Sequence, residues 1–278
     1  MRLSISNIAW DVAEDAEIAR LLKRFDIDAI DVAPTKYFPH LTEASDDAIS
    51  RVSEWWSDRG IEITGMQSLL FGTPGLNLFG PPQMREEMLQ YLAAVCRVGA
   101  GLGARRLVFG SPRNRDRVRL SDDEVHDIAC AFFRRLGDIA SSLGVTICLK
   151  PNPAAYGANF MTTSAETAAV TADVDRPAVK MQLDTGAMAI NGEAVDAVLP
   201  QFAHLIGHVH ASEPQLLPLG DGTCPHDEIF VALQTYLPDH VVTVEMLATV
   251  GEPHHASVAR ALSSAIQHYR SNQARANL

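Results

Sequence analysis

Two carboxylates and an imidazole, those of Asp184, Glu245 and His210, are the groups of this chain best suited to hold a metal ion or transfer a proton. Each stands at the end of a short apolar run of the kind that forms a buried strand. Such groups suit Mn²⁺, Mg²⁺, Co²⁺ or Zn²⁺, and three protein ligands are enough for a catalytic metal site. Lys150 ends another run, "VTICLK", and a lysine is seldom buried without a partner. We therefore expect chemistry where these strands end, with Lys150 as its unusual member.

Polar residues also end most of the other apolar runs, namely Asn7, Asp31, Gln67, Ser111 and His208. Polar groups that converge in a partly desolvated pocket are costly unless they bind one another, a metal or a substrate. His208 and His210 are two residues apart, so on a strand both rings point to one face. His210 is nearer the strand end and is the better ligand, whereas His208 is a candidate for a substrate contact or for a partner of a ligand.

Three further cations are candidates for substrate contacts. Arg113 and Arg115 follow a predicted strand in "VFGSPRNR", and their guanidinium groups suit a phosphate or a carboxylate. At the mouth of an acidic protein they would form an anion clamp. Lys36, in "APTK", is a candidate for a contact at the rim.

The elements that must position these residues alternate regularly. Eight strand-like runs cover residues 3–10, 27–34, 61–68, 104–111, 145–152, 179–186, 205–212 and 241–248. Helical spacing is found at 15–25, 46–59, 84–102, 122–143, 164–173, 226–237 and 255–269. Strict alternation predicts a parallel sheet, and eight units fit a closed (β/α)₈ TIM barrel forming a single domain over residues 1–278. The alternative is an open doubly wound sheet, but no predicted strand is followed by a glycine-rich phosphate-binding turn.

Three connections, after the third, fifth and seventh runs, are long and rich in apolar residues, glycine and proline. In a barrel these connections form the rim of the active-site mouth. We expect them either to close over a small ligand or to pack on one another.

Composition narrows the function classes. The 278 residues are 47% hydrophobic with a formal net charge of -11, which argues against a nucleic acid partner. No apolar run is long enough to cross a membrane, and the N-terminal residues lack a signal-peptide core, so we expect a cytoplasmic protein. Four scattered cysteines form neither a zinc motif nor a disulfide framework.

Eight motifs in order, "SNIAWD", "VAPTKYF", "MQSLLFG", "VFGSPRNR", "PNPAAYG", "LDTGAMAING", "HVHASEP" and "VEML", resemble the sugar phosphate isomerase/epimerase family of the xylose-isomerase-like barrel superfamily. The resemblance covers essentially the whole chain and implies an isomerase or epimerase that acts on a small polyhydroxylated carbonyl compound. It also implies a divalent metal held by a glutamate, an aspartate, a histidine and a glutamate from strands five to eight.

Three of these metal ligands match Asp184, His210 and Glu245, but the glutamate of strand five falls on Lys150. In ketose 3-epimerases of the superfamily the two glutamates also form the acid/base pair, so this one change affects metal binding and proton transfer together. Tyr156 stands where those epimerases place a substrate-binding glutamate, and Ala187 stands where they place a histidine.

Three roles for Lys150 remain open. Its ammonium takes the metal's place between Asp184 and Glu245 and stabilises an oxyanion; or a metal binds through three ligands and Lys150 is a base; or Lys150 forms a Schiff base in a lyase or aldolase. A non-catalytic sugar-binding protein is a fourth possibility.

We expect proton abstraction beside a carbonyl, with catalytic residues Lys150, Glu245 and His210. The substrate contacts expected are Asn7, Lys36, Gln67, Arg113, Arg115, Asn152, Tyr156, His208 and Glu213. The expected partner is a small sugar or an anionic sugar derivative, and a homodimer is left open.

Overall fold

Eight parallel strands close into a barrel in the computed structural model, which describes residues 1–117 and 119–270. Each strand pairs with its neighbour in chain order, and β8 pairs with β1 to close the sheet. The strands are β1 (Leu3–Ser6), β2 (Ala29–Val32), β3 (Glu62–Met66), β4 (Arg106–Phe109), β5 (Thr146–Leu149), β6 (Val179–Asp184), β7 (Ile206–Ser212) and β8 (Val242–Glu245). The (β/α)₈ barrel predicted from the alternation of strands and helices is confirmed.

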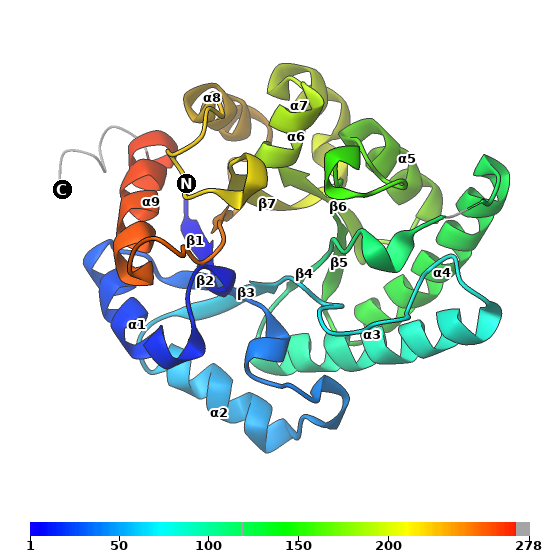
Figure 1. Cartoon of the computed structure of the whole chain (residues 1–278), viewed down its shortest axis with the longest axis horizontal. Coiled ribbons are helices and arrows are strands. Elements are labelled where there is room, and N and C mark those ends of the chain that lie inside the picture. The colour runs from blue at the N-terminus through cyan, green and yellow to red at the C-terminus, as the bar shows by residue number, and fades with distance from the viewer. Residues whose placement is uncertain (118, 271–278) are drawn as a thin grey trace.

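Helices surround the ring of strands on its outside (Figure 1). They are α1 (Asp15–Arg24), α2 (Asp46–Ser57), α3 (Pro82–Leu102), α4 (Asp122–Ser142), α5 (Ser164–Val174), α6 (Thr185–Asn191), α7 (Val195–Phe202), α8 (His226–Tyr236) and α9 (His254–Tyr269). The sequence did not predict α6 and α7. They have 7 and 8 residues, and α7 contains Pro200, so neither offers a long helical period. Among the described helices, none combines the length and the apolar character that a membrane span requires.

The barrel interior is polar. Along β1 and β8, buried serine, threonine and glutamate residues alternate with buried leucine, isoleucine and valine, as successive side chains of a strand point to opposite faces. The apolar set joins the core shared with the helices. Asp31 of β2 bonds to His208 of β7, and these strands are not neighbours, so the bond crosses the interior.

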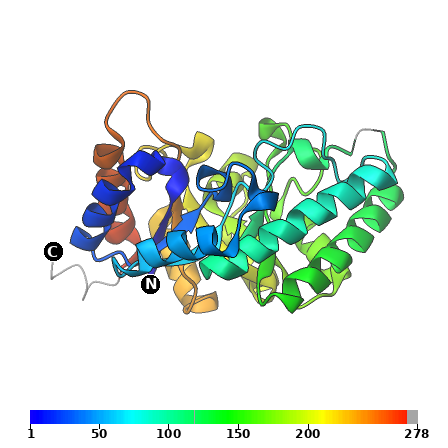
Figure 2. The same cartoon turned by 90° about the horizontal axis from the view of Figure 1, so that it is seen from below.

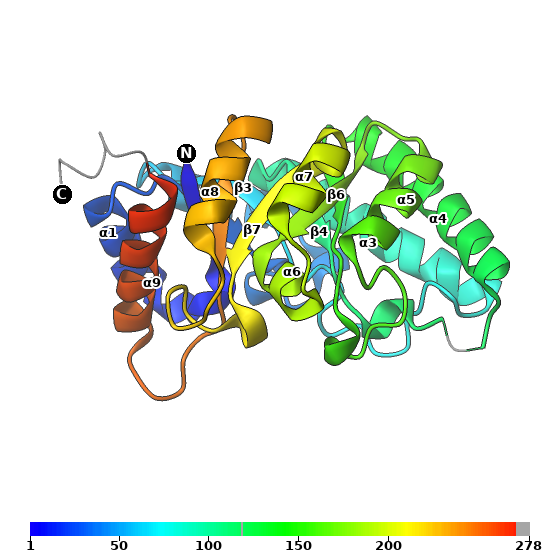
Figure 3. The ribbon, with the colours of Figure 1, turned by 90° about the horizontal axis from the view of Figure 1, so that it is seen from above.

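The connections that follow the strands gather at one edge of the barrel. Figures 2 and 3 show them from two sides, with the orange loop after β8 projecting at the edge away from the N-terminus. This is the edge where Lys150, Asp184 and Glu245 stand, at or just after the ends of β5, β6 and β8.

Candidate active site

A cavity of about 420 Å³ opens at this edge, within the roughly 300–1,000 Å³ range of small-molecule sites. Its wall is built from the ends of β3 to β8 and from the loops that follow them. The lining residues are Gln67, Ser68, Leu70, Phe71, Val108, Gly110, Ser111, Pro112, Lys150, Asn152, Tyr156, Asp184, Gly186, Ala187, Glu213, Gln215, Leu216, Glu245 and Leu247.

Lys150 lies between two carboxylates at the base of this cavity. Its Nζ is 2.8 Å from Asp184 Oδ2 and 2.6 Å from Glu245 Oε2, and all three side chains are nearly buried. Burial alone would lower the pKa of Lys150, but the charges of the two carboxylates outweigh it and raise the pKa above its ordinary value. Lys150 is therefore an ammonium ion throughout the physiological range.

Glu245 receives donors on both of its oxygens. Gln67 Nε2 donates to Oε1 at 2.9 Å, Lys150 binds Oε2, and His210 Nδ1 lies 3.2 Å from Oε2. Burial would raise the pKa of Glu245, but Lys150 and His210 hold it well below its usual range. Glu245 is thus ionised.

Asp184 is held from the opposite side by the start of α6. Its Oδ1 accepts from the Ala187 backbone N–H at 2.8 Å and from Ser212 Oγ at 2.8 Å, which leaves Oδ2 for Lys150. An aspartate at the N-cap of a helix is favoured because it satisfies a free backbone donor. This capping fixes the carboxylate that faces Lys150.

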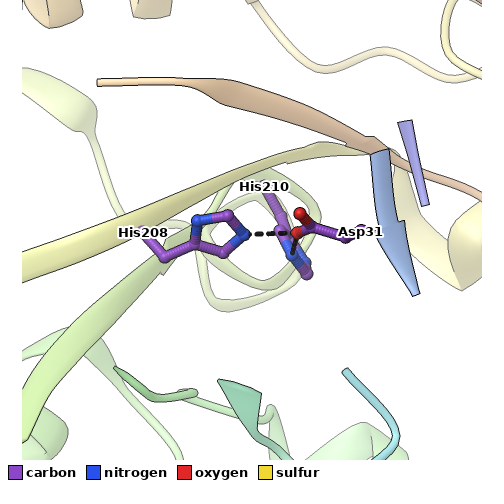
Figure 4. A group of neighbouring side chains, drawn as sticks. All are labelled: Asp31, His208 and His210. Atoms are coloured by element: carbon purple, nitrogen blue, oxygen red, sulfur yellow. Dashed lines mark hydrogen bonds and ion pairs between the residues drawn. The ribbon is translucent and has the colours of Figure 1, made fainter. Parts of the chain in front are cut away.

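His210 joins the site to a buried pair beneath it (Figure 4). Its Nε2 lies 3.6 Å from Asp31 Oδ2, and the same oxygen is 2.6 Å from His208 Nε2. Burial would lower the pKa of His210, but Glu245 and Asp31 raise it to about 9. Because its ring bonds to Asp31, His208 is a partner of that carboxylate, and it does not line the cavity. Residue 65, beside Asp31, is a glycine because a Cβ there would lie 2.6 Å from Asp31 Oδ1.

Asp184, His210 and Glu245 lie close enough to share a metal ion, as their ligand atoms are within 4.8 Å of one another. However, the Lys150 ammonium occupies the space between the two carboxylates and uses the oxygens that would face the ion. A divalent cation beside a buried ammonium meets strong repulsion. The residues present do not fit a metal while Lys150 is charged.

The predicted substrate contacts divide into two groups. Gln67, Asn152, Tyr156 and Glu213 line the cavity. The remaining predicted contacts are not among the described residues that line the cavity; they are Asn7, Lys36, Arg113, Arg115 and His208. Asn7 Oδ1 accepts from the Ala33 backbone N–H at 2.7 Å, and Lys36 donates to the backbone carbonyls of Asn7 and Trp10, so these two tie loops together.

Neither Arg113 nor Arg115 is among the described residues that line the cavity. Arg115 is fully buried, its Nη1 donates to the Lys150 carbonyl at 2.9 Å, and burial lowers its pKa to about 9. Arg115 ends the short turn Arg113–Arg115 after β4, and its bond to the Lys150 carbonyl joins that turn to the end of β5.

Three residues that line the cavity were not predicted from the sequence, and all three have left-handed backbone conformations. Ser68, Gln215 and Leu216 have φ values of 56°, 61° and 54°, although none is glycine. Left-handed backbone at such residues costs free energy and clusters at functional sites. No sequence signal marks these positions, because serine, glutamine and leucine rarely adopt this conformation.

Glu213 holds the long connection between β7 and α8 in place. Its Oε1 accepts from His226 Nε2 at 3.1 Å and from the Gly220 backbone N–H at 3.2 Å, and its Oε2 accepts from the Cys224 N–H at 3.1 Å. Burial would raise the pKa of Glu213, but His226 and Cys224 lower it to about 2. Glu213 thus supports the wall of the cavity.

A Glu213→Gln variant is expected to be less stable than the wild type above about pH 4.5 and to lose that deficit as the pH falls toward 2. The folded pKa is depressed, so the stabilisation is full above the unfolded value and disappears as the carboxylate is protonated. The deficit should be roughly 1–3 kcal/mol. Urea unfolding at a series of pH values measures it, with Glu228→Gln on α8 as the control. Parallel pH profiles for wild type and Glu213→Gln would contradict this role.

Comparison with known proteins identifies relatives with the same barrel. A segment of 116 residues is 28% identical to D-psicose 3-epimerase of Agrobacterium fabrum (strain C58 / ATCC 33970), covering 42% of this chain and 40% of that enzyme. D-Psicose 3-epimerase with D-tagatose from Clostridium cellulolyticum H10 has a TM-score of 0.82 at 19% identity, over 98% of this chain and 100% of the other. 3-Keto-D-glucoside 4-epimerase from E. coli has a TM-score of 0.77 at 19% identity, over 95% and 98%.

At such identities the two solved structures establish the fold. The family profile described as xylose isomerase-like TIM barrel matches residues 19–269, which is most of the chain. The protein therefore belongs to the xylose isomerase-like TIM barrel family.

Proposed function

We propose that the protein is a sugar isomerase or epimerase that moves a proton on the carbon beside a carbonyl, with the Lys150 ammonium in the place of a metal ion. The observation that carries this proposal is the position of Lys150 Nζ, 2.8 Å from Asp184 Oδ2 and 2.6 Å from Glu245 Oε2. The relatives named above are sugar epimerases, which supports the same class of substrate for this cavity.

The local charge supports the exchange of a metal ion for a lysine. The family resemblance places a glutamate at position 150 beside a divalent cation, and those two together carry one positive charge. A single lysine carries the same charge. The carboxylates of Asp184 and Glu245 therefore meet one positive charge from position 150 and its ion in either arrangement.

The mechanism uses groups already in position. An ammonium has three donors, and Asp184 and Glu245 occupy two of them, so the third can bind the carbonyl oxygen of a sugar. Glu245 removes the proton from the neighbouring carbon, and the electron pair of that C–H bond moves onto the oxygen as an enediolate. Lys150 stabilises the oxyanion. Return of this proton by Glu245 to the adjacent carbon gives an isomer, whereas an epimer forms when water donates a proton to the other face of the enediolate and Glu245 releases its own proton to solvent.

Two alternatives for this site predict different outcomes. A Schiff-base lyase needs a neutral amine at Lys150, and the two carboxylates that raise the pKa of Lys150 oppose it. A sugar-binding protein without activity needs no proton transfer. The fate of the substrate's carbon-bound hydrogen distinguishes the binding protein from an isomerase, and a covalent adduct trapped on Lys150 distinguishes the lyase.

The test is incubation of the protein with D-psicose, D-fructose, D-tagatose and L-ribulose in D₂O, followed by NMR. We expect deuterium at a carbon beside the carbonyl of at least one sugar, with no added metal. Binding of a sugar without deuterium exchange would favour the sugar-binding protein without activity. A borohydride-trapped adduct on Lys150 that depends on the sugar would favour the lyase.

A further inference from the structure

The mouth of the cavity is apolar and open. Leu70, Phe71, Pro112, Tyr156, Leu216 and Leu247 line it together with the catalytic groups. Phe71 is 71% exposed, Leu247 is 50% exposed and Tyr156 is 37% exposed. Scattered single apolar residues on a surface need no explanation, but here several meet in one concave site.

This apolar mouth is held by bonds between loops. The Leu247 backbone N–H donates to the Leu216 carbonyl at 2.9 Å, which joins the loops after β8 and β7. The Gln215 N–H donates to Tyr156 Oη at 2.7 Å, which joins the loops after β7 and β5. The left-handed backbone of Gln215 and Leu216 directs the chain between these bonds. Groups fixed in advance lose little freedom when a ligand binds, which favours affinity.

The charge of the cavity opposes an anionic ligand. Of the described residues that line it, Lys150 is the one cation, and Asp184 and Glu245 compensate its charge. His210, behind Glu245, is a second cation, and it faces the carboxylates of both Glu245 and Asp31. Glu213 adds a further carboxylate with a pKa of about 2. A phosphate or carboxylate on the substrate would meet excess negative charge in a partly desolvated site.

We propose that the substrate is an uncharged sugar that carries an apolar substituent, such as an alkyl or aryl group, and that Phe71 and Leu247 bind this substituent. The sugar carbonyl lies at Lys150 and the substituent extends through the mouth. This inference rests on the proposed function for the position of the carbonyl, but it concerns the other end of the ligand. It departs from the anionic sugar derivative that the sequence left open, because Arg113 and Arg115 are not among the described residues that line the cavity.

The experiment compares one ketose in three forms: unmodified, with a benzyl ether at the carbon farthest from the carbonyl, and with a phosphate there. Calorimetry gives the Kd of each, and deuterium exchange gives its kcat and KM. We expect the benzyl form to bind about tenfold more tightly than the unmodified sugar, as burial of part of a ring would give. The phosphate form should bind more weakly than the unmodified sugar.

Phe71→Ser and Leu247→Ser should each reduce the benzyl preference severalfold. Val231→Ser, at a 63% exposed site on α8 away from the cavity, should leave it unchanged. Equal affinity for the benzyl and unmodified forms, or tighter binding of the phosphate, would overturn the inference while exchange into the unmodified sugar persists. Absence of exchange from every form would instead count against the proposed function, and the order of the Kd values would still decide the ligand class.

Discussion

Replacing Lys150 with methionine is expected to slow deuterium exchange by about 10²–10³-fold, the loss seen when an oxyanion donor is removed. It should also reduce the free energy of unfolding by about 3–5 kcal/mol, because two buried carboxylates lose their counter-ion. Asp184 and Glu245 would then face each other without a cation, and one of them would take up a proton. Exchange kinetics and urea unfolding at neutral pH measure the two effects.

Lys180→Met is the matched control for Lys150→Met. Lys180 stands on β6 four residues before Asp184, and its Nζ lies 3.4 Å from the His204 carbonyl. Lys180 does not line the cavity within the described residues, so exchange should persist in this variant. If Lys150→Met kept the wild-type exchange rate, the oxyanion role assigned to Lys150 would be wrong.

The barrel and the residues at its mouth could be read from the sequence for a physical reason. Buried parallel strands appear as apolar runs, and their ends fall on one edge whatever the loops do. Lys150, Asp184 and Glu245 each follow such a run, so their convergence needs only the topology. Alternation along β7 likewise put His208 and His210 on one face.

The partners of these residues could not be read in the same way. Asp31 bonds to His208 across the barrel, although the two residues are 177 positions apart in the sequence. The local sequence of neither strand predicts that contact. Arg115 is buried in one short turn, and the backbone donors to Glu213 come from the loop between β7 and α8. Loop geometry and cross-barrel contacts depend on the whole fold, so local patterns do not contain them.

The proposal that Lys150 replaces a metal-binding glutamate can be tested by restoring a glutamate at position 150. Lys150→Glu is expected to convert the site into one that binds a single divalent cation per chain, with Asp184, His210 and Glu245 as the other ligands. Without a metal the variant should be unstable, since three buried carboxylates would lie together and repel one another.

Added Mn²⁺, Co²⁺ or Zn²⁺ should therefore restore stability to Lys150→Glu, by about 2.7 kcal/mol when the free ion is 100 times its Kd. Elemental analysis of the dialysed protein and unfolding with and without metal measure this gain. Lys180→Glu, which adds the same charge away from the cavity, should gain no such site. Asp184→Asn in the Lys150→Glu background should weaken the metal binding, because it removes one charged ligand. Stoichiometric metal in the wild type would argue instead that Lys150 and an ion share the site, and the ammonium could then no longer be the ion's replacement.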